Sequence, residues 1–157
     1  MKTLVAYYSL SGTNRRAAEI VAGALGADLE EIKASPMVPL LILKAWLGMG
    51  TKIGEPKRDP SEYGLVVVGG PVFAGKLAAP VKSYLDRERA SLPGKVAFFL
   101  VCGGRGDREA LAGMEKAAGR KPVATAVITV GDKKRLSVEN EAQAKAFAET
   151  LKTLGVS

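Results

Sequence analysis

The sequence YYSLSGTN occupies residues 7–14, directly after the short apolar run of residues 3–6. Such an apolar run is typical of a strand that is buried on both faces of a parallel sheet. The segment after it carries three hydroxyl side chains, Ser9, Ser11 and Thr13, around a flexible glycine. A simple connector needs few turn residues, so this loop indicates a ligand-binding site at the end of the first strand.

Apolar runs and helical segments alternate along the rest of the chain. Short apolar runs predict strands at residues 4–8, 28–32, 65–68, 96–101 and 124–130. Helical spacing of apolar residues predicts helices over residues 17–25, 80–85, 111–118 and 144–151. Strands that alternate with helices form βαβ units, so we expect an α/β fold: a three-layer, doubly wound sandwich around a five-stranded parallel sheet.

Length and composition limit the class of protein. The 157 residues suit a single domain, expected to span residues 1–157, and neither a signal peptide nor a spanning helix is visible. A cytoplasmic location is therefore expected. The single cysteine, Cys102, excludes an internal disulfide and a cysteine-based zinc site. Because histidine is absent, Ser-His and Cys-His nucleophiles are excluded, and we identify no catalytic acid or base and no metal ligands.

The net charge of +7 favours anionic partners such as a phosphate, a nucleic acid or a lipid headgroup. The basic residues are scattered, with one run of three at Lys133-Lys134-Arg135. They lack the interleaved aromatic residues of proteins that bind single strands. We therefore expect no nucleic acid partner.

Ligands of doubly wound sheets bind beyond the carboxyl ends of the strands, so the informative loops are residues 9–14, 69–76 and 102–107. In the first loop, hydroxyl groups at a helix N-terminus suit a phosphate. Its single glycine excludes the dinucleotide fingerprint. The alternative is that Thr13 or Asn14 simply caps the following helix.

The second loop begins like a phosphate-binding P-loop, but Leu77 occupies the position that requires Ser or Thr. We expect residues 71–75 to form a rigid turn whose apolar surface lies against a flat aromatic ring. The alternative places Phe73 in the core. In the third loop, backbone N–H groups are expected to bind the polar edge of a ring, Asp107 to cap the next helix, and Cys102 to be a small buried residue.

Together these loops resemble the flavodoxin family, and the resemblance covers nearly the whole chain. The first loop is similar to the family's phosphate loop, T/S-x-T-G-x-T, and residues 64–75 to its third strand and flavin-contacting loop. Residues 80–85 are similar to the helix that follows. The resemblance implies the strand order 2-1-3-4-5 and non-covalent FMN, with its phosphate at residues 9–14 and its isoalloxazine between residues 71–76 and 102–107.

The cofactor-binding residues that this implies are Ser9, Leu10, Ser11, Gly12, Thr13, Asn14, Pro71, Val72, Phe73, Ala74, Gly75, Cys102, Gly103, Gly104 and Asp107. The implied function is electron transfer to a redox partner protein or to a small acceptor such as a quinone. Two alternatives stay open: an FMN-dependent quinone or small-acceptor oxidoreductase, and a non-enzymatic regulatory or binding domain of the same fold. Electron-carrying flavodoxins are typically acidic. The positive charge of this chain is expected to stabilise a reduced, anionic flavin and raise its potential.

Residues 37–50 are unusually apolar for a connector. One interpretation is the second helix of the fold, buried on the sheet. The other is an exposed apolar helix or lid, which with nearby lysines would contact a membrane surface, a quinone or a partner protein. The sequence does not indicate an oligomeric state.

Overall fold

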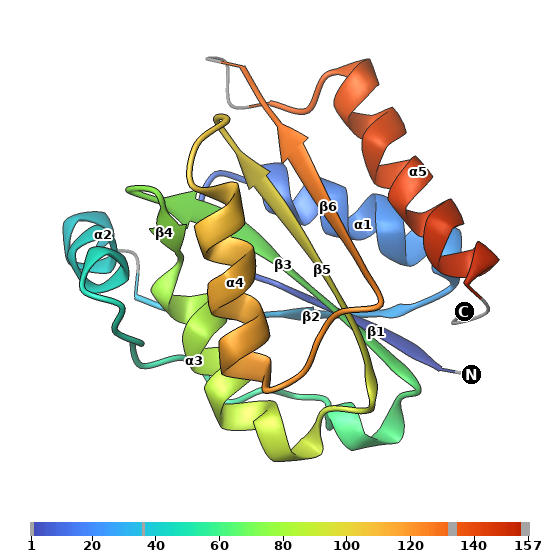
Figure 1. The fold of residues 1–157 in the computed structure, drawn as a ribbon, viewed down its shortest axis with the longest axis horizontal. Helices are drawn as coiled ribbons and strands as arrows, with labels where there is room; N and C mark the ends of the chain where they lie inside the picture. Colours follow the sequence, from blue (N-terminus) through green and yellow to red (C-terminus); the bar gives the residue numbers. More distant parts are fainter. Residues whose placement is uncertain (1, 36, 132–134, 155–157) are drawn as a thin grey trace.

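The structure is a computed structural model, and it describes residues 2–35, 37–131 and 135–154. A central sheet is covered by helices on both faces (Figure 1). The strands are β1 (Thr3–Tyr7), β2 (Asp28–Glu31), β3 (Leu65–Phe73), β4 (Lys76–Leu77), β5 (Lys95–Cys102) and β6 (Ala124–Thr129). The helices are α1 (Thr13–Leu25), α2 (Val38–Trp46), α3 (Ala79–Glu88), α4 (Asp107–Ala118) and α5 (Val138–Thr153), with short 3-10 turns at Pro60–Glu62 and Arg89–Ser91.

The sheet confirms the predicted fold class. Five parallel strands lie in the order β2-β1-β3-β5-β6, which is the predicted order 2-1-3-4-5 counted along the parallel strands. The short strand β4 pairs antiparallel with the end of β3 and was not predicted. Of the basic run at residues 133–135, residues 133 and 134 lie outside the described part of the chain.

Strand β3 is longer than predicted, and the prediction of a rigid turn over residues 71–75 is wrong. The strand continues to Phe73, and only Ala74 and Gly75, with φ of 50° and 76°, form the turn into β4. Two consecutive glycines do not end the strand, because Gly69 and Gly70 remain paired with β5, and neighbouring side chains fill the space above them. A Cβ on Gly69 would lie 2.0 Å from the Phe99 ring, and one on Gly70 would lie 2.5 Å from Val81.

Each face of the sheet carries its own hydrophobic core. Side chains alternate along β1, so Leu4 and Ala6 join the core beneath α2, α3 and α4, whereas Val5 and Tyr7 join the core beneath α1 and α5. Figure 1 shows these two helical layers on opposite sides of the sheet. This arrangement is the doubly wound sandwich that the alternation of apolar runs predicted.

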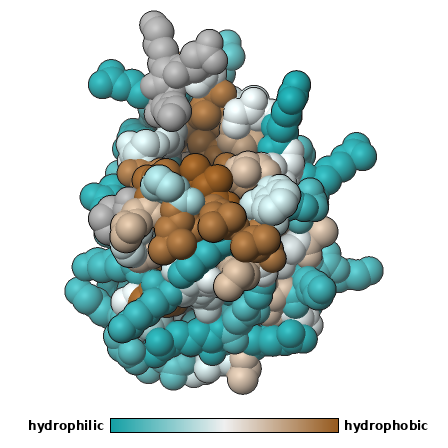
Figure 2. Space-filling view, turned by 90° about the vertical axis from the view of Figure 1, so that its left-hand side faces the viewer, coloured by the Kyte–Doolittle hydropathy of each residue, from teal (hydrophilic) through white to brown (hydrophobic). Residues whose placement is uncertain are grey.

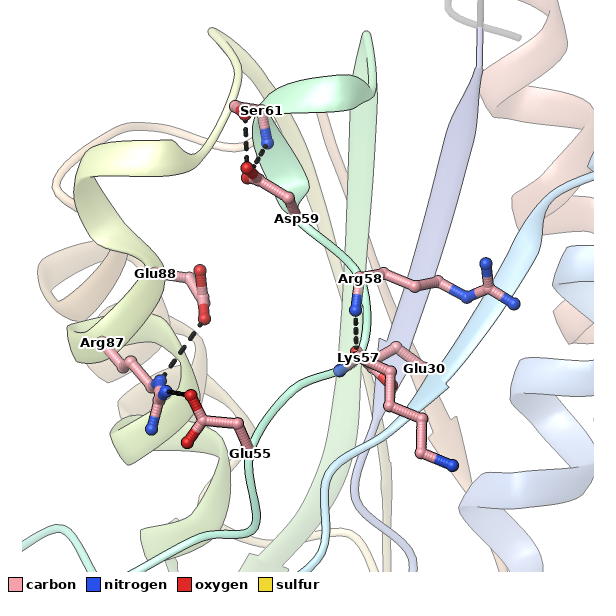
Figure 3. A network of polar contacts seen from close by, with 8 residues as sticks. All are labelled: Glu30, Glu55, Lys57, Arg58, Asp59, Ser61, Arg87 and Glu88. Atoms are coloured by element: carbon pink, nitrogen blue, oxygen red, sulfur yellow. Dashed lines mark hydrogen bonds and ion pairs between the residues drawn. The ribbon is translucent and has the colours of Figure 1, made fainter.

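The segment that returns from α2 to β3 is fastened to the sheet by polar contacts (Figure 3). The buried carboxylate of Glu30 in β2 accepts hydrogen bonds from the backbone N–H groups of Lys57, at 2.6 Å, and Arg58, at 2.8 Å. From α3, Arg87 forms ion pairs with Glu55 and Glu88. Burial raises the pKa of the Glu88 carboxyl above its usual range.

Candidate functional site

A pocket of about 550 Å³ opens at the carboxyl ends of β3 and β5, beside the loop that follows β1. This place, at the carboxyl end of the sheet between β1 and β3, is the topological switch point, where doubly wound folds bind their ligands. The pocket brings together parts of all three predicted loops. The predicted residues that line it are Leu10, Ser11, Thr13, Asn14, Pro71, Val72, Phe73, Ala74, Cys102 and Gly103.

The other predicted residues lie close by but do not line this pocket: Ser9, Gly12, Gly75, Gly104 and Asp107. Ser9 shapes the first loop, because its Oγ accepts a hydrogen bond from the N–H of Gly12 at 3.0 Å. The expected capping role of Asp107 is wrong, since Gly106 is the N-cap of α4 and Asp107 is the first helical residue. In that position its carboxylate still interacts favourably with the helix dipole.

Several lining residues were not predicted: Val38 and Ile42 of α2, Val101 of β5, and Val130 and Gly131 after β6. The apolar character of residues 37–50 was visible in the sequence, but nothing there linked this segment to the pocket. Val130 and Gly131 follow the last strand, so the rule that ligands bind at strand ends would have indicated them. The pocket therefore has an additional apolar wall.

The first loop leads directly into the N-terminus of α1. Its N-cap is Gly12, in the left-handed conformation at φ 93°, so the alternative that Thr13 or Asn14 caps the helix is wrong. The Oγ of Ser11 lies 2.9 Å from the Oγ1 of Thr13, close enough for one hydroxyl to donate to the other. Gly12 has no side chain with which to satisfy the N–H groups of the first turn.

The charges around this helix end also favour an anion. The first turn of α1 contains no acidic residue, whereas α4 and α5 each begin with two. Arg15 and Arg16 lie in the first turn and form ion pairs with Glu31, at 2.8 Å, and Glu141, at 2.9 Å. The positive end of the helix dipole thus faces a loop that carries no carboxylate of its own.

Asn14 is the clearest sign that the pocket accommodates a ligand. Its side chain lines the pocket and is only 3% exposed, yet its Oδ1 has no hydrogen-bond partner among the described residues. An unsatisfied buried acceptor costs roughly 1–3 kcal/mol. A ligand hydroxyl or N–H group that reaches this oxygen would remove that cost.

The second loop gives the pocket an apolar wall. Phe73 is almost fully buried and packs edge-on against Tyr8, with ring centroids 6.3 Å apart at 86°. It also lines the pocket, so Phe73 belongs both to the core and to the candidate site. Burial raises the pKa of the Tyr8 phenol above its usual value.

The third loop contacts the second loop beside the pocket. A Cβ on Gly106 would lie 2.5 Å from the Cα and the carbonyl oxygen of Gly75, so the two loops touch through their backbones. Cys102 is buried at the end of β5, as expected from the sequence. The two loops predicted to flank a ring are therefore held at a fixed separation.

The structure is similar to those of flavoproteins and flavodoxins. A flavoprotein from Lactobacillus acidophilus NCFM, solved as a crystal structure in complex with FMN, is 26% identical with a TM-score of 0.70, over 80% of this chain and 92% of that chain. Oxidised Flavodoxin 2 from Bacillus cereus is 14% identical with a TM-score of 0.65, over 98% and 99%. A flavodoxin from the domain Archaea is 23% identical with a TM-score of 0.56, over 97% and 99%.

No protein-family model matches the chain, and no curated protein sequence matches it. The structural likeness nevertheless covers nearly the whole chain in both flavodoxins. It agrees with the strand order and with the position of the pocket at the carboxyl ends of the strands. The resemblance predicted from the sequence is confirmed at the level of the fold, and this chain has a flavodoxin-like fold.

Proposed function

We propose that this chain binds FMN non-covalently in the pocket and uses it to transfer electrons. The observation that carries the proposal is that a helix N-terminus and an apolar pocket lie side by side at the carboxyl end of the sheet. The uncapped N-terminus of α1 suits a phosphate, and it borders a largely apolar pocket of about 550 Å³. This volume lies within the range of about 300–1,000 Å³ that small-molecule sites occupy.

The residues present fit FMN part by part. Ser11, Thr13 and the first turn of α1 would hold the phosphate, because hydroxyl and N–H donors match its anionic oxygens. The buried Oδ1 of Asn14 would accept a hydrogen bond from a hydroxyl of the ribityl chain. Val72 and Phe73 would lie against the apolar ring. The bound flavin would supply the redox chemistry, and the protein would supply its position and electrostatic surroundings.

The similar flavoprotein from Lactobacillus acidophilus supports this assignment, since its structure was solved with FMN. The positive net charge of this chain favours an acidic protein as its redox partner. A cytoplasmic location, expected from the sequence, is part of the same proposal.

A second candidate is an FMN-dependent reductase of a small acceptor such as a quinone. The observation that favours it is the wall of α2, where Ile42 lines the pocket and is also partly exposed. An apolar acceptor such as a quinone could therefore contact α2 both inside the pocket and at its mouth. Electron transfer to a partner protein does not require an apolar wall of this kind.

The test begins with the visible spectrum of the purified protein, with and without added FMN, followed by a redox titration. We expect a protein-bound flavin spectrum and quenching of flavin fluorescence that saturates at one equivalent. Steady turnover of quinones with a reduced donor would favour the reductase, and transfer only to a protein acceptor would favour the carrier. A folded protein that remains colourless and ignores FMN would contradict both.

A further inference from the structure

Helix α2 exposes apolar side chains that the sheet does not cover. Only Leu41 and Ala45, one turn apart, are buried beneath it. Figure 2 shows a hydrophobic area in the middle of the face where α2 lies, bordered by hydrophilic side chains. We call the following residues the α2 patch: Met37, Leu40, Leu43, Trp46, Leu47 and Met49.

The α2 patch is more apolar than the outer face of an ordinary surface helix. Such a helix carries polar residues on the side away from the core, but within α2 the only charged residue is Lys44. Leu40, Leu43 and Leu47 follow one another at helical spacing, and Trp46 stands 62% exposed beside them. A contiguous exposed apolar area of this kind marks an interaction surface.

The charged residues of the chain segment that carries the α2 patch are all lysines. From Ile32 to Gly54 the sequence contains no Asp or Glu, and its charged residues are Lys33, Lys44 and Lys52. None of these lysines forms an ion pair with another described residue. Lys44 instead donates a hydrogen bond to the Oγ1 of Thr51 at 3.0 Å.

We propose that the α2 patch docks peripherally on a bilayer surface rich in anionic lipids. Leucine, methionine and tryptophan side chains can enter the boundary between headgroups and acyl chains, while lysines around them contact anionic headgroups. A second copy of the chain fits less well, because it would bring two sets of unpaired lysines together. An acidic protein would match the lysines but not the protruding apolar side chains.

The docking is peripheral because no helix among the described residues is long and apolar enough to cross a membrane. Val38 and Ile42 belong to the same helix and line the candidate pocket. Docking through α2 would therefore place the pocket next to the lipid surface. The proposal itself does not depend on FMN, since neither the patch nor the lysines belong to the proposed flavin contacts.

Trp46 is the only tryptophan of the chain, so its fluorescence reports on the α2 patch alone. The purified protein is mixed with vesicles of phosphatidylcholine, or of equal parts phosphatidylcholine and phosphatidylglycerol, and binding is measured by flotation. We expect binding to the anionic vesicles only, weakened by added salt. Trp46 emission should shift to shorter wavelengths and be quenched by lipids with brominated acyl chains.

Two variants locate the contact. Leu43→Glu changes an exposed residue of the α2 patch that does not line the pocket, and it should weaken vesicle binding by about tenfold or more. Val138→Glu is the matched control, because Val138 is exposed at the start of α5, on the other side of the sheet from α2 (Figure 1). It should bind like the parent.

Three results would overturn the proposal. The first is a failure of the folded protein to bind anionic vesicles. The second is equal binding by Leu43→Glu and the parent with unchanged Trp46 emission, which would assign binding to general positive charge. The third is a shift of Trp46 emission that follows protein concentration without vesicles, which would show that a second copy covers the patch.

Discussion

Gly106 and Gly75 meet backbone to backbone, so that a Cβ on Gly106 would lie 2.5 Å from the Cα of Gly75. This contact joins the loop after β5 to the turn between β3 and β4. It fixes the two walls between which the flavin ring is proposed to lie. Gly106 is also the N-cap of α4, with φ of 80°, so the same residue sets the start of a helix.

Gly106→Ala should therefore push the two loops apart and weaken FMN binding by about tenfold or more, equivalent to at least about 1.4 kcal/mol. Gly104→Ala is the matched control. It carries a comparable left-handed φ of 104°, but its Cβ would meet only an ordinary contact, 3.7 Å from Thr129. Both variants should lose some stability from the strained φ, measured by thermal unfolding. Equal FMN affinities in the two variants would contradict a special role for the Gly75–Gly106 contact.

Ser11→Ala and Thr13→Ala test the phosphate site. Each removes one hydroxyl that is proposed to bind the phosphate, and a hydrogen bond to a charged group contributes about 1.5–3 kcal/mol. Each variant should bind FMN roughly 10–100-fold more weakly in a fluorescence titration, with little change in its binding of riboflavin, which lacks the phosphate. Unchanged FMN affinity in both would remove the phosphate assignment of this loop.

Asn14→Leu separates a ligand contact from a structural role. In the FMN-free protein the Oδ1 of Asn14 is buried without a partner among the described residues, so an apolar side chain of similar size should keep or raise the free energy of unfolding. The same change should weaken FMN binding, because the acceptor for the ligand is lost. A variant that loses stability and keeps its FMN affinity would show that Asn14 serves the fold.

Glu30 anchors the segment that leads to β3. Its carboxylate accepts two backbone N–H groups, from Lys57 and Arg58, and it is buried. Glu30→Ala leaves both donors without this acceptor and should lower the free energy of unfolding by about 2 kcal/mol or more. Glu30→Gln keeps an acceptor oxygen and should cost less. Chemical denaturation measures both, and equal losses would show that the hydrogen bonds are not the cause.

Glu88 should make stability depend on pH. Burial raises the pKa of its carboxyl above the ordinary value of 4.5, and this effect exceeds the opposite one of Arg87. Between the unfolded and folded pKa values the folded state holds more protons, so the contribution of Glu88 to stability falls as pH rises through that interval. Glu88→Gln lacks this titration and should be relatively more stable at about pH 7 than at about pH 4. Parallel pH profiles of thermal unfolding for the parent and the variant would contradict this.

The α/β sandwich was predictable because it depends on local patterns, whereas the strand order came from the resemblance to the flavodoxin family. The runs that form β1, β3 and β5 are buried on both faces, and the helices between the strands carry one apolar face, so alternation alone indicates the doubly wound sheet. The first loop was predictable for a similar reason, since its polar residues are adjacent in sequence. The structure brings Ser11, Thr13 and Asn14 to the same pocket as Phe73 and Cys102.

The failures depend on contacts between distant residues. The predicted strand ended before Gly69-Gly70, but both glycines pair with β5, and the strand continues to Phe73. Asp107 suggested a cap, whereas the actual cap is Gly106, which lies against the backbone of the distant Gly75. Likewise, the helical pattern of α2 could not show that only Leu41 and Ala45 reach the core.

The most direct test of the account is an equilibrium titration of the FMN-free protein with FMN and, in parallel, with riboflavin. The two ligands share the ring and the ribityl chain and differ only in the phosphate. The account predicts that FMN binds with one equivalent per chain and at least about 100-fold more tightly than riboflavin, because a phosphate at the N-terminus of α1 makes several charge-assisted hydrogen bonds. Equal affinities, or no binding of either ligand by the folded protein, would contradict the central claim that this pocket is an FMN site.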